Sequence, residues 1–259
     1  MFMAFKYIPD VGKEIRYNRI INPSTDRMVI IPLDHGIILG PLPGIENPAQ
    51  TVKDVISGGV NSVVFNAGLA PRLYKEYMNK CGAIFNLTNV ITEEQGITLI
   101  STVEYAIRNG ADAVSVQIQV GSKHEQHMLN NARIVLDQCS NWGIPVLGMM
   151  YPTEKLLEKN GTDAILHAAR AGAELGFDIV KTSYTGDSIS FKNLVDSCPV
   201  PVVIAGGPKA NSSQQILSMV KEAIRCGAAG VALGRNVWQH PNPAQVTEDI
   251  VNIVHHQNL

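Results

Sequence analysis

Lys181 stands at the end of a short apolar run and is well placed for covalent chemistry. The run Phe177-Asp178-Ile179-Val180 is typical of a buried strand, so the next side chain is expected to point into the fold or its mouth. Burial and nearby cations favour the neutral amine of a lysine, which attacks a carbonyl carbon to give a carbinolamine and then an iminium. Position alone leaves a structural alternative open, in which the ammonium reaches the rim or pairs with a carboxylate such as Asp34.

Other apolar runs end in groups that can move protons. Tyr151, followed by Pro152, carries a phenol that can protonate the carbinolamine and deprotonate the hydroxyl whose ionisation drives carbon–carbon cleavage. Asp34 can bind a substrate hydroxyl or share protons with Lys181 and His35. In the alternative interpretation Tyr151 only fills the end of a strand with its hydroxyl in water, and Asp34 only holds Lys181 in place.

Two glycine turns late in the chain predict a phosphate site. Gly206-Gly207 follows one apolar run and offers backbone N–H groups with no side chain in the way, and Gly234-Arg235 follows the next run and adds a guanidinium. In barrel enzymes phosphate often binds in the loops after the seventh and eighth strands. The two turns together therefore predict one phosphate site more strongly than either does alone.

A metal centre is not expected. His124 and His127 flank Glu125 on a predicted helix and His255-His256 lies at the tail, but none of these histidines follows a strand. They are interpreted as surface residues, and only His35 is placed for work in a site. We expect no metal and no other cofactor.

Eight short apolar runs alternate with longer segments of helical periodicity, which predicts a single (β/α)8 barrel. The expected strands are Met28–Leu33, Ser62–Phe65, Ala83–Leu87, Ala113–Ile118, Pro145–Met150, Asp178–Thr182, Pro201–Ala205 and Gly230–Leu233. The expected helices are Pro48–Ser57, Leu99–Asn109, Lys123–Asn141, Asp163–Leu175, Ile189–Ser197, Ser212–Cys226 and Asn242–His256. Catalytic residues of such barrels lie at the carboxyl ends of the strands, where the residues above fall.

Glycines just past three predicted helices, Gly110, Gly176 and Gly227, are expected to form the turns at the other end of the barrel. A doubly wound sheet is the alternative, but neither its Gly-x-Gly-x-x-Gly turn nor a Walker-type loop is present. Residues 1–259 are expected to form one domain, with 1–27 as an N-terminal arm or a helix that caps the barrel.

Composition excludes several classes of protein. The chain has 259 residues, 45% of them hydrophobic, and a formal net charge of -2, so nucleic-acid or membrane-surface binding has no electrostatic support. Apolar stretches stay short of the ~20 residues of a membrane helix, and the first residues lack the pattern of a signal peptide. The four scattered cysteines fit a reducing cytoplasm.

The same strand ends carry a family resemblance. Asp34-His35-Gly36, Met149-Met150-Tyr151-Pro152, the run from Asp178 to Asp187 with Lys181-Thr182-Ser183-Tyr184, Ala205-Gly206-Gly207-Pro208-Lys209 and Gly230 to Asn236 resemble the archaeal-type class I aldolases. That family includes fructose-bisphosphate aldolase and 2-amino-3,7-dideoxy-D-threo-hept-6-ulosonate synthase. The similarity extends from the first strand to the C-terminus and is closer to the synthase.

The resemblance implies that Lys181 forms the Schiff base, Tyr151 is the acid and base, and Asp34 is a substrate and proton-transfer partner. It implies that Gly206, Gly207, Gly234 and Arg235 grip a phosphate, with His35 and Ser183 also contacting substrate. The implied reaction is aldol cleavage of a ketose 1-phosphate, with transfer of a fragment to an aldehyde on a route to aromatic precursors. Family members form rings, so a homo-oligomer is expected.

Departures from the family leave the aldehyde open. Thr153-Glu154 stands where the family usually has Arg-Gly, and the ends of the second to fourth strands lack the histidines associated with the synthase. The alternatives are a fructose-bisphosphate aldolase proper, a thiolase-like transferase that uses the same lysine, and a non-catalytic barrel that binds a sugar phosphate.

Overall fold

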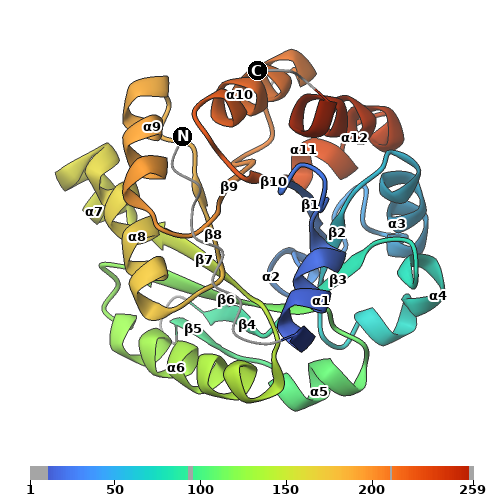
Figure 1. The fold of residues 1–259 in the computed structure, drawn as a ribbon, viewed down its shortest axis with the longest axis horizontal. Helices are drawn as coiled ribbons and strands as arrows, with labels where there is room; N and C mark the ends of the chain where they lie inside the picture. The colour runs from blue at the N-terminus through green and yellow to red at the C-terminus, as the bar shows by residue number, and fades with distance from the viewer. Residues whose placement is uncertain (1–10, 93–95, 211, 257–259) are drawn as a thin grey trace.

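The computed structural model describes residues 11–92, 96–210 and 212–256, and its eight parallel strands close into a barrel (Figure 1). Around the ring the order is β1-β10-β9-β8-β7-β6-β3-β2. The strands are β1 (Met28–Pro32), β2 (Ser62–Asn66), β3 (Gly82–Asn86), β6 (Ala113–Val120), β7 (Val146–Pro152), β8 (Ile179–Ser183), β9 (Val202–Ala205) and β10 (Gly230–Ala232). The predicted (β/α)8 barrel is confirmed, and each predicted strand ends within two residues of an observed one.

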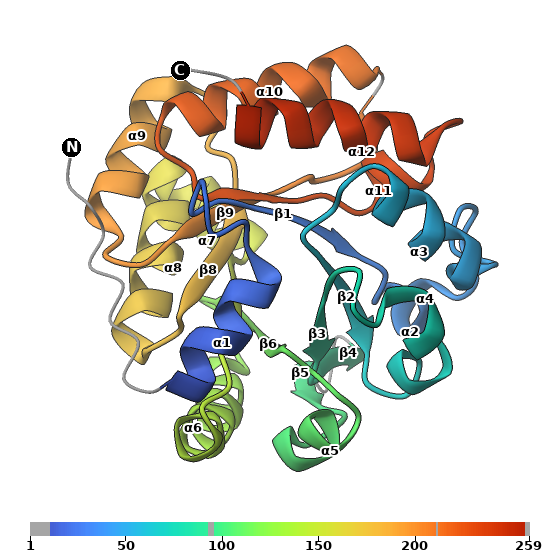
Figure 2. The same cartoon turned by 45° about the vertical axis from the view of Figure 1, so that its right-hand side comes forward.

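Helices cover the outside of the ring (Figures 1 and 2). The longer ones are α3 (Pro48–Ser57), α5 (Val103–Arg108), α6 (Glu125–Trp142), α7 (Glu154–Asn160), α8 (Thr162–Leu175), α9 (Ser188–Ser197), α10 (Ser213–Arg225) and α12 (Pro243–Val251). Single turns form α2 (Gly36–Leu39), α4 (Tyr74–Tyr77), α11 (Arg235–Trp238), the 3-10 turn Ala70–Arg72 and the π-helical turn Asn252–His256. The three predicted turn glycines, Gly110, Gly176 and Gly227, have positive φ angles of 82°, 98° and 100°, a conformation that glycine adopts without steric cost.

A two-stranded antiparallel sheet of β4 (Thr88–Thr92) and β5 (Gly96–Leu99) lies between β3 and α5, and the sequence analysis did not predict it. The helix expected over Leu99–Asn109 therefore begins later, at Val103. Its start is fixed by Thr102, whose side chain accepts a hydrogen bond from the backbone N–H of Tyr105 at 3.1 Å. The β-branched residues of the hairpin favour extended backbone, which explains why the helix does not extend back through it.

The inside of the barrel is filled by side chains at every second strand position. One buried cluster combines Met28 and Ile30 of β1 with single residues of the other seven strands: Val64, Ile84, Ala113, Leu147, Ile179, Val203 and Ala232. Because side chains alternate across a strand, residues two or four positions further along also point inward. This alternation decides which residues can reach the mouth of the barrel.

Helix α1 (Val11–Ile20) lies across the amino-terminal end of the strands (Figures 1 and 2). Its buried Tyr17 and Ile20 join the inner cluster of the barrel. Lys13 forms an ion pair with Asp178 at 2.6 Å, and Arg19 pairs with Asp112 at 3.1 Å. The segment for which an arm or a capping helix was expected thus contains a helix packed against the barrel end, while the division into a single domain stays a prediction.

The ring closes where β1 pairs with β10, with Met28 opposite Gly230. A Cβ atom on Gly230 would lie 1.9 Å from the carbonyl oxygen of Met28, so no larger residue fits without moving a strand. The closure therefore depends on a bare backbone at this position.

Candidate active site

Lys181 points into the mouth of the barrel from β8. It lies two residues after the inward-facing Ile179, and its strand neighbours are Met149 of β7 and Val203 of β9. The residue is only 8% exposed, which places its amine away from bulk water. The preference for an inward-facing lysine over one in solvent is therefore supported by the geometry.

Tyr151 stands beside Lys181 at the end of β7. Burial raises the pKa of the Tyr151 hydroxyl, while the Lys181 ammonium opposes the rise through its charge and a side-chain hydrogen bond, and the Asp34 carboxylate adds to it. The balance keeps the phenol protonated in the free protein, so Tyr151 holds a proton ready next to the amine.

Asp34 enters the same space from β1, and two asparagines fix it. Nδ2 of Asn86, at the end of β3, donates to Oδ2 of Asp34 at 2.9 Å. Nδ2 of Asn66, at the end of β2, donates to the backbone carbonyl of Asp34 at 2.7 Å. Asn89 in turn donates to Oδ1 of Asn66 at 3.3 Å. One neutral donor thus holds the carboxylate and another holds the backbone of Asp34, so the structure gives this residue a partner other than Lys181.

The amide of Asn86 cannot turn over, because its oxygen is already engaged. Oδ1 of Asn86 accepts from the backbone N–H of Thr88 at 3.2 Å and from Oγ of Ser115 at 3.3 Å. The nitrogen must therefore face Asp34, so the direction of this hydrogen bond is fixed.

His35 lies next to Asp34 and contacts α11, the short helix after the last strand. Its Nδ1 is 3.4 Å from Oδ1 of Asp34, and its ring packs edge-on against Trp238 at a centroid distance of 5.5 Å. Burial lowers the pKa of His35; the Asp34 carboxylate opposes this change, and the charges of Lys181 and Arg235 add to it. Neutral imidazole is therefore the favoured form near pH 7.

The two glycine turns lie side by side. Nη2 of Arg235 donates to the carbonyl oxygen of Gly207 at 3.1 Å. A Cβ atom on Gly207 would meet no other atom within 4 Å, so this turn faces open space, whereas one on Gly234 would lie 3.0 Å from the His35 ring. Gly207 therefore leaves room for a ligand. Gly234 must lack a side chain because His35 packs closely against its backbone.

The side chain of Asn236, in the short helix after β10, holds the loop that contains Gly206 and Gly207. Its Nδ2 donates to the carbonyls of Gly206 at 2.9 Å and Pro208 at 3.1 Å, and its Oδ1 accepts from the backbone N–H of Ala210 at 2.8 Å. The side chain is 9% exposed. One buried amide thus fixes the shape of the loop after β9.

Ser183 ends β8, two residues beyond Lys181, so both side chains lie on the inner side of the strand. It is half-buried, as expected for a residue at the rim. The structure therefore brings together at one end of the barrel all the residues for which a catalytic or binding role was predicted.

Comparison with known proteins agrees with this arrangement. The family described as DeoC/LacD family aldolase matches residues 28–240, which span the ring from its first strand to the turn after its last. The chain belongs to the DeoC/LacD aldolases.

Two relatives and one solved structure place this aldolase more closely. It is 34% identical to the 2-amino-4,5-dihydroxy-6-oxo-7-(phosphonooxy)heptanoate synthase of Streptomyces griseus, over 94% of this chain and 90% of the relative. It is 37% identical to the 2-amino-3,7-dideoxy-D-threo-hept-6-ulosonate synthase of Halobacterium salinarum, over 95% and 92%. A Schiff-base-forming fructose-1,6-bisphosphate aldolase superposes with a TM-score of 0.85 at 28% identity, over 94% of this chain and all of the other. The predicted resemblance, closer to the synthases, is confirmed.

The sequence analysis predicted no role in the aldolase's site for three residues: Asn66, Asn86 and Asn236. Asn66 and Asn86 each lie two residues after an inward-facing core residue, Val64 and Ile84, so the alternation of the strands places them at the mouth. Nothing in the sequence shows that they would bind Asp34. In the sequence, Asn236 is marked only by its position after Arg235, at the end of the run from Gly230 that resembles the class I aldolases.

The histidines interpreted as surface residues divide into two kinds. His127 and His256 are exposed, whereas His124 and His255 are half-buried. His255 bonds to Oγ1 of Thr25 at 2.8 Å and to Oδ1 of Asn61 at 2.9 Å, near the amino-terminal end of the barrel. Among the described residues of the aldolase no group of three or more His, Cys, Asp or Glu side chains is arranged to hold a metal ion, and no helix there is long and apolar enough to cross a membrane.

The departure from the family after Tyr151-Pro152 has a local structural role. Oγ1 of Thr153 accepts from the backbone N–H of Leu156 at 3.3 Å and so caps α7, which begins with the exposed Glu154. The carboxylate lies in the first turn of that helix, where a negative charge is favourable.

Proposed function

We propose that this aldolase cleaves or forms a carbon–carbon bond of a ketose 1-phosphate through a Schiff base on Lys181. The observation that carries the proposal is the pairing of a buried inward-facing lysine with the Tyr151 phenol, next to the fixed carboxylate of Asp34. The similarity to synthases and to a Schiff-base-forming aldolase supports it.

In the cleavage direction Nζ of Lys181 attacks C2 of the ketose, and the carbinolamine loses water after Tyr151 protonates its hydroxyl. The phenolate then removes the proton of the C4 hydroxyl, the C3–C4 bond breaks, and its electron pair moves through C3 to the iminium nitrogen. The aldehyde leaves, and the enamine is protonated at C3 or attacks another aldehyde. Hydrolysis returns the amine and releases the product.

Asp34 and the phosphate grip position the sugar. The carboxylate can accept hydrogen bonds from substrate hydroxyls, and His35 and Ser183 lie where they can add further contacts. The open backbone of Gly207, with the guanidinium of Arg235 beside it, suits the 1-phosphate. Binding energy at this remote group orients C2 toward Lys181.

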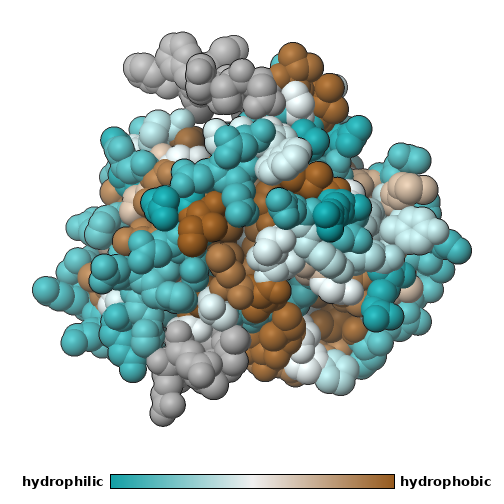
Figure 3. Space-filling model, turned by 90° about the horizontal axis from the view of Figure 1, so that it is seen from below, coloured by the Kyte–Doolittle hydropathy of each residue, from teal (hydrophilic) through white to brown (hydrophobic). Residues whose placement is uncertain are grey.

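We infer further that the enzyme acts in the cytoplasm, as a homo-oligomer, on a route to aromatic precursors. The similarity to the two synthases supports the route. Figure 3 shows that hydrophobic residues are exposed on the face of the molecule seen from below. Exposed apolar side chains of the described part of the chain include Tyr105 of α5 at 42% and Ile134 and Trp142 of α6 at 40% and 54%. Exposed apolar residues of this kind are common where subunits meet.

Borohydride reduction in the presence of ketose 1-phosphates, followed by peptide mass measurement, tests the mechanism. The reduced substrate is expected on the peptide that contains Lys181, and neither Lys181→Ala nor Lys181→Arg should be labelled or active, since a guanidinium is never the neutral nucleophile. Activity should survive EDTA. Labelling of another lysine, or inactivation by the chelator, would contradict the proposal. A non-catalytic sugar-phosphate barrel would bind without labelling, and a thiolase-like enzyme would require an acyl donor.

A further inference from the structure

Gln117 and Gln119 lie on the inner side of β6, near its carboxyl end. Ala113 of this strand belongs to the inner cluster of the barrel. Alternate residues of the strand belong instead to the core outside the ring: Val114, Val116, Ile118 and Val120. Because side chains alternate across a strand, the two glutamines share the inner side with Ala113. Both are half-buried, whereas the rest of the strand is buried, so their amides reach the mouth of the barrel.

The two glutamines are close strand neighbours of the proposed catalytic residues. Gln119 pairs with Tyr151, and Gln117 pairs with Met149, which in turn pairs with Lys181. Paired residues of neighbouring parallel strands lie about 4.8 Å apart, and their side chains point to the same side of the sheet. Gln119 therefore lies next to the Tyr151 phenol, and Gln117 lies at the level of Lys181, two strands away.

The amides of both glutamines are free to bind a ligand. The backbone N–H of Gln117 donates to Oγ1 of Thr88 at 2.9 Å, which fixes this part of the strand. Among the residues that the structure describes, however, neither side-chain amide has a hydrogen-bond partner. Each amide offers two N–H donors and one acceptor oxygen. Together they form a neutral polar surface beside the reacting groups.

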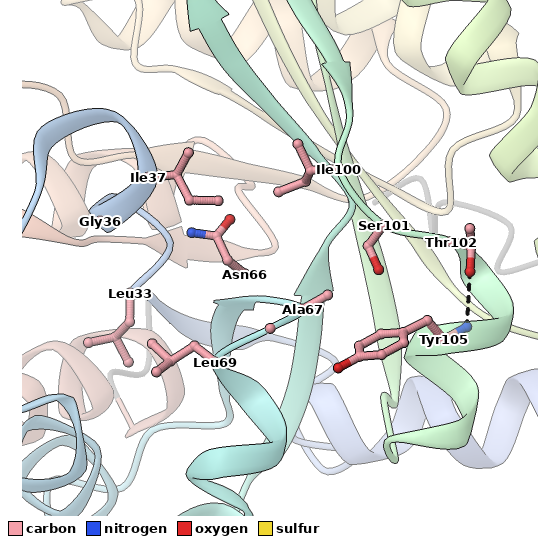
Figure 4. A pocket seen from close by; sticks show the side chains of 11 residues that line it. Leu33, Gly36, Ile37, Asn66, Ala67, Leu69, Ile100, Ser101, Thr102 and Tyr105 are labelled. Carbon is pink, nitrogen blue, oxygen red and sulfur yellow. Dashed lines mark hydrogen bonds between the residues drawn. The ribbon is translucent and has the colours of Figure 1, made fainter.

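Asn66, at the end of β2, differs because its amide is engaged at both ends. The nitrogen donates to the carbonyl of Asp34 at 2.7 Å, and the oxygen accepts from Asn89 at 3.3 Å. The hollow of about 690 Å³ that Asn66 lines is mainly apolar, and Ile37 and Ile100 point into it (Figure 4). Polar groups of a substrate therefore find free amides at β6 and not at β2.

The order of the strands sets the direction of a bound ketose. The proposed phosphate turns follow β9 and β10, Lys181 lies on β8, Tyr151 on β7 and the two glutamines on β6, and these strands are consecutive in the ring. With the 1-phosphate at the turns and C2 on Lys181, the C4 hydroxyl faces Tyr151. The carbons beyond C4, which come from the aldehyde, then lie beside β6.

The inner side of β6 and β7 carries no charge near the mouth. Its residues there are Gln117, Gln119, Met149 and Tyr151, and the first cation after β6, Lys123, is exposed in the following loop. A phosphate is held best by a guanidinium, an ammonium or a group of backbone N–H donors. Amides instead suit smaller polar groups, because the nitrogen donates to a carboxylate or hydroxyl and the oxygen accepts from an ammonium or hydroxyl.

We propose that Gln117 and Gln119 select the aldehyde by binding the polar groups of its chain, and that this aldehyde carries hydroxyl, amino or carboxylate groups but no phosphate. The inference rests on the proposed function and adds two specificity-determining residues. The enamine carbon of the donor on Lys181 attacks the aldehyde carbon, the aldehyde oxygen takes the proton of Tyr151, and water hydrolyses the resulting iminium. During this step the amides hold the rest of the aldehyde beside β6.

Acceptor kinetics give the first test. With dihydroxyacetone phosphate as the donor, kcat/KM is measured for aspartate semialdehyde, for butanal and for glyceraldehyde 3-phosphate. Butanal has the same carbon chain as aspartate semialdehyde but lacks its amino and carboxylate groups. We expect aspartate semialdehyde to exceed each of the others by at least about tenfold, the ratio that ~1.4 kcal/mol of hydrogen bonding to charged groups produces. A smaller ratio to either one would overturn the inference.

Gln117→Met and Gln119→Met keep the length of the side chain and remove its amide. Each should lower the ratio of kcat/KM for aspartate semialdehyde to that for butanal by at least about tenfold. Gln138→Met, at a half-buried position in the last turns of α6, is the control and should keep the wild-type ratio. An unchanged ratio in a site variant would overturn the assignment of that residue.

The ratio also distinguishes a binding role from a structural one. Both aldehydes are measured on the same preparation, so a loss of folded enzyme lowers both values alike and leaves the ratio unchanged. Gln119→Glu supplies a second replacement of similar size. It should lower the ratio too, because a carboxylate cannot donate to the carboxylate of the acceptor and repels it. A ratio that this variant leaves unchanged would count against Gln119.

Exchange of the C3 proton of dihydroxyacetone phosphate with deuterium oxide separates this inference from the proposed function. The exchange requires the iminium and the proton carrier but no acceptor. If the wild-type protein exchanges this proton and is labelled at Lys181, yet its acceptor ratios do not depend on the two glutamines, only the acceptor inference fails. If it neither exchanges nor is labelled, the Schiff-base function fails.

Discussion

The amide of Asn86 donates a 2.9 Å hydrogen bond to Oδ2 of Asp34, and this joins β3 to β1 across the inside of the barrel. The two strands are not neighbours in the ring, since β2 lies between them. The orientation of the Asp34 carboxylate thus depends on a residue that itself need not touch substrate. Asn86 is therefore a positioning residue.

Replacing Asn86 by aspartate should weaken catalysis more than binding. A second carboxylate at this distance favours sharing of a proton with Asp34, so kcat should fall by about 10- to 100-fold, with a smaller change in KM, and the acidic limb of the kcat profile should move to higher pH. Asn130→Asp, on the exposed surface of α6, is the matched control. An unchanged pH profile with reduced stability would show that Asn86 has only a structural role.

Tyr151→Phe removes one oxygen and keeps the ring. If the phenol next to Lys181 carries the proton, kcat should fall by about 10²- to 10⁴-fold while the protein stays folded and its affinity for inorganic phosphate is nearly unchanged. Steady-state kinetics and phosphate calorimetry measure the two quantities. A loss in kcat of less than about fivefold would move the acid and base role to Asp34 or His35.

Arg235→Ala should show whether Arg235 contacts the phosphate group or another part of the substrate. If the guanidinium contacts the 1-phosphate, KM should rise for the phosphorylated ketose and stay the same for the free ketose, which already lacks that contact. Kinetics with both substrates, in wild type and variant, decide the point. An equal loss with both would mean that Arg235 only holds the Gly207 turn through its carbonyl.

His255 should make stability depend on pH. Burial, with smaller effects of His256 and Arg27, lowers the pKa of His255 to about 4, below the ordinary value of 6.5. The folded state therefore holds the neutral ring, and this stabilisation is complete above pH 6.5 and lost as the pH falls from 6.5 to about 4. The effect should be about 1 kcal/mol after allowance for screening of a half-exposed ring.

Urea unfolding at pH 7 and pH 5 measures this contribution. His255→Gln should lose less stability between the two pH values than the wild type, because glutamine does not titrate. His167→Gln, at an exposed position of α8, should behave like the wild type. The same pH dependence in all three proteins would exclude His255 as the titrating group.

The sequence predicts the eight ring strands because each is a short apolar run bounded by turn residues, and Lys181 because it breaks such a run with a charge. It does not predict the β4–β5 hairpin, and the helix expected to begin at Leu99 begins at Val103 because Thr102 caps it. The roles of Lys181, Tyr151 and the phosphate turns stay predictions.

The asparagines show why the rest of the site could not be predicted from the sequence. Asn86 binds a residue 52 positions away, and Asn236 binds carbonyls 28 and 30 positions earlier. An amide has the same appearance in the sequence whether it faces solvent or a carboxylate, so its partner is defined only when strand order and register are known.

The ring closes between its first and last strands, and this affects the order in which the site is assembled during folding. Asp34 and His35 follow β1, whereas Arg235 follows β10, and the halves meet through the His35–Trp238 contact and a 3.1 Å hydrogen bond from Nε1 of Trp238 to the carbonyl of Pro32. Contacts between such distant parts of a chain require closure of a long loop and are therefore expected to form late in folding. The residues that follow β1 and those that follow β10 therefore come together only when the ring closes, so the site is complete only in the fully folded barrel.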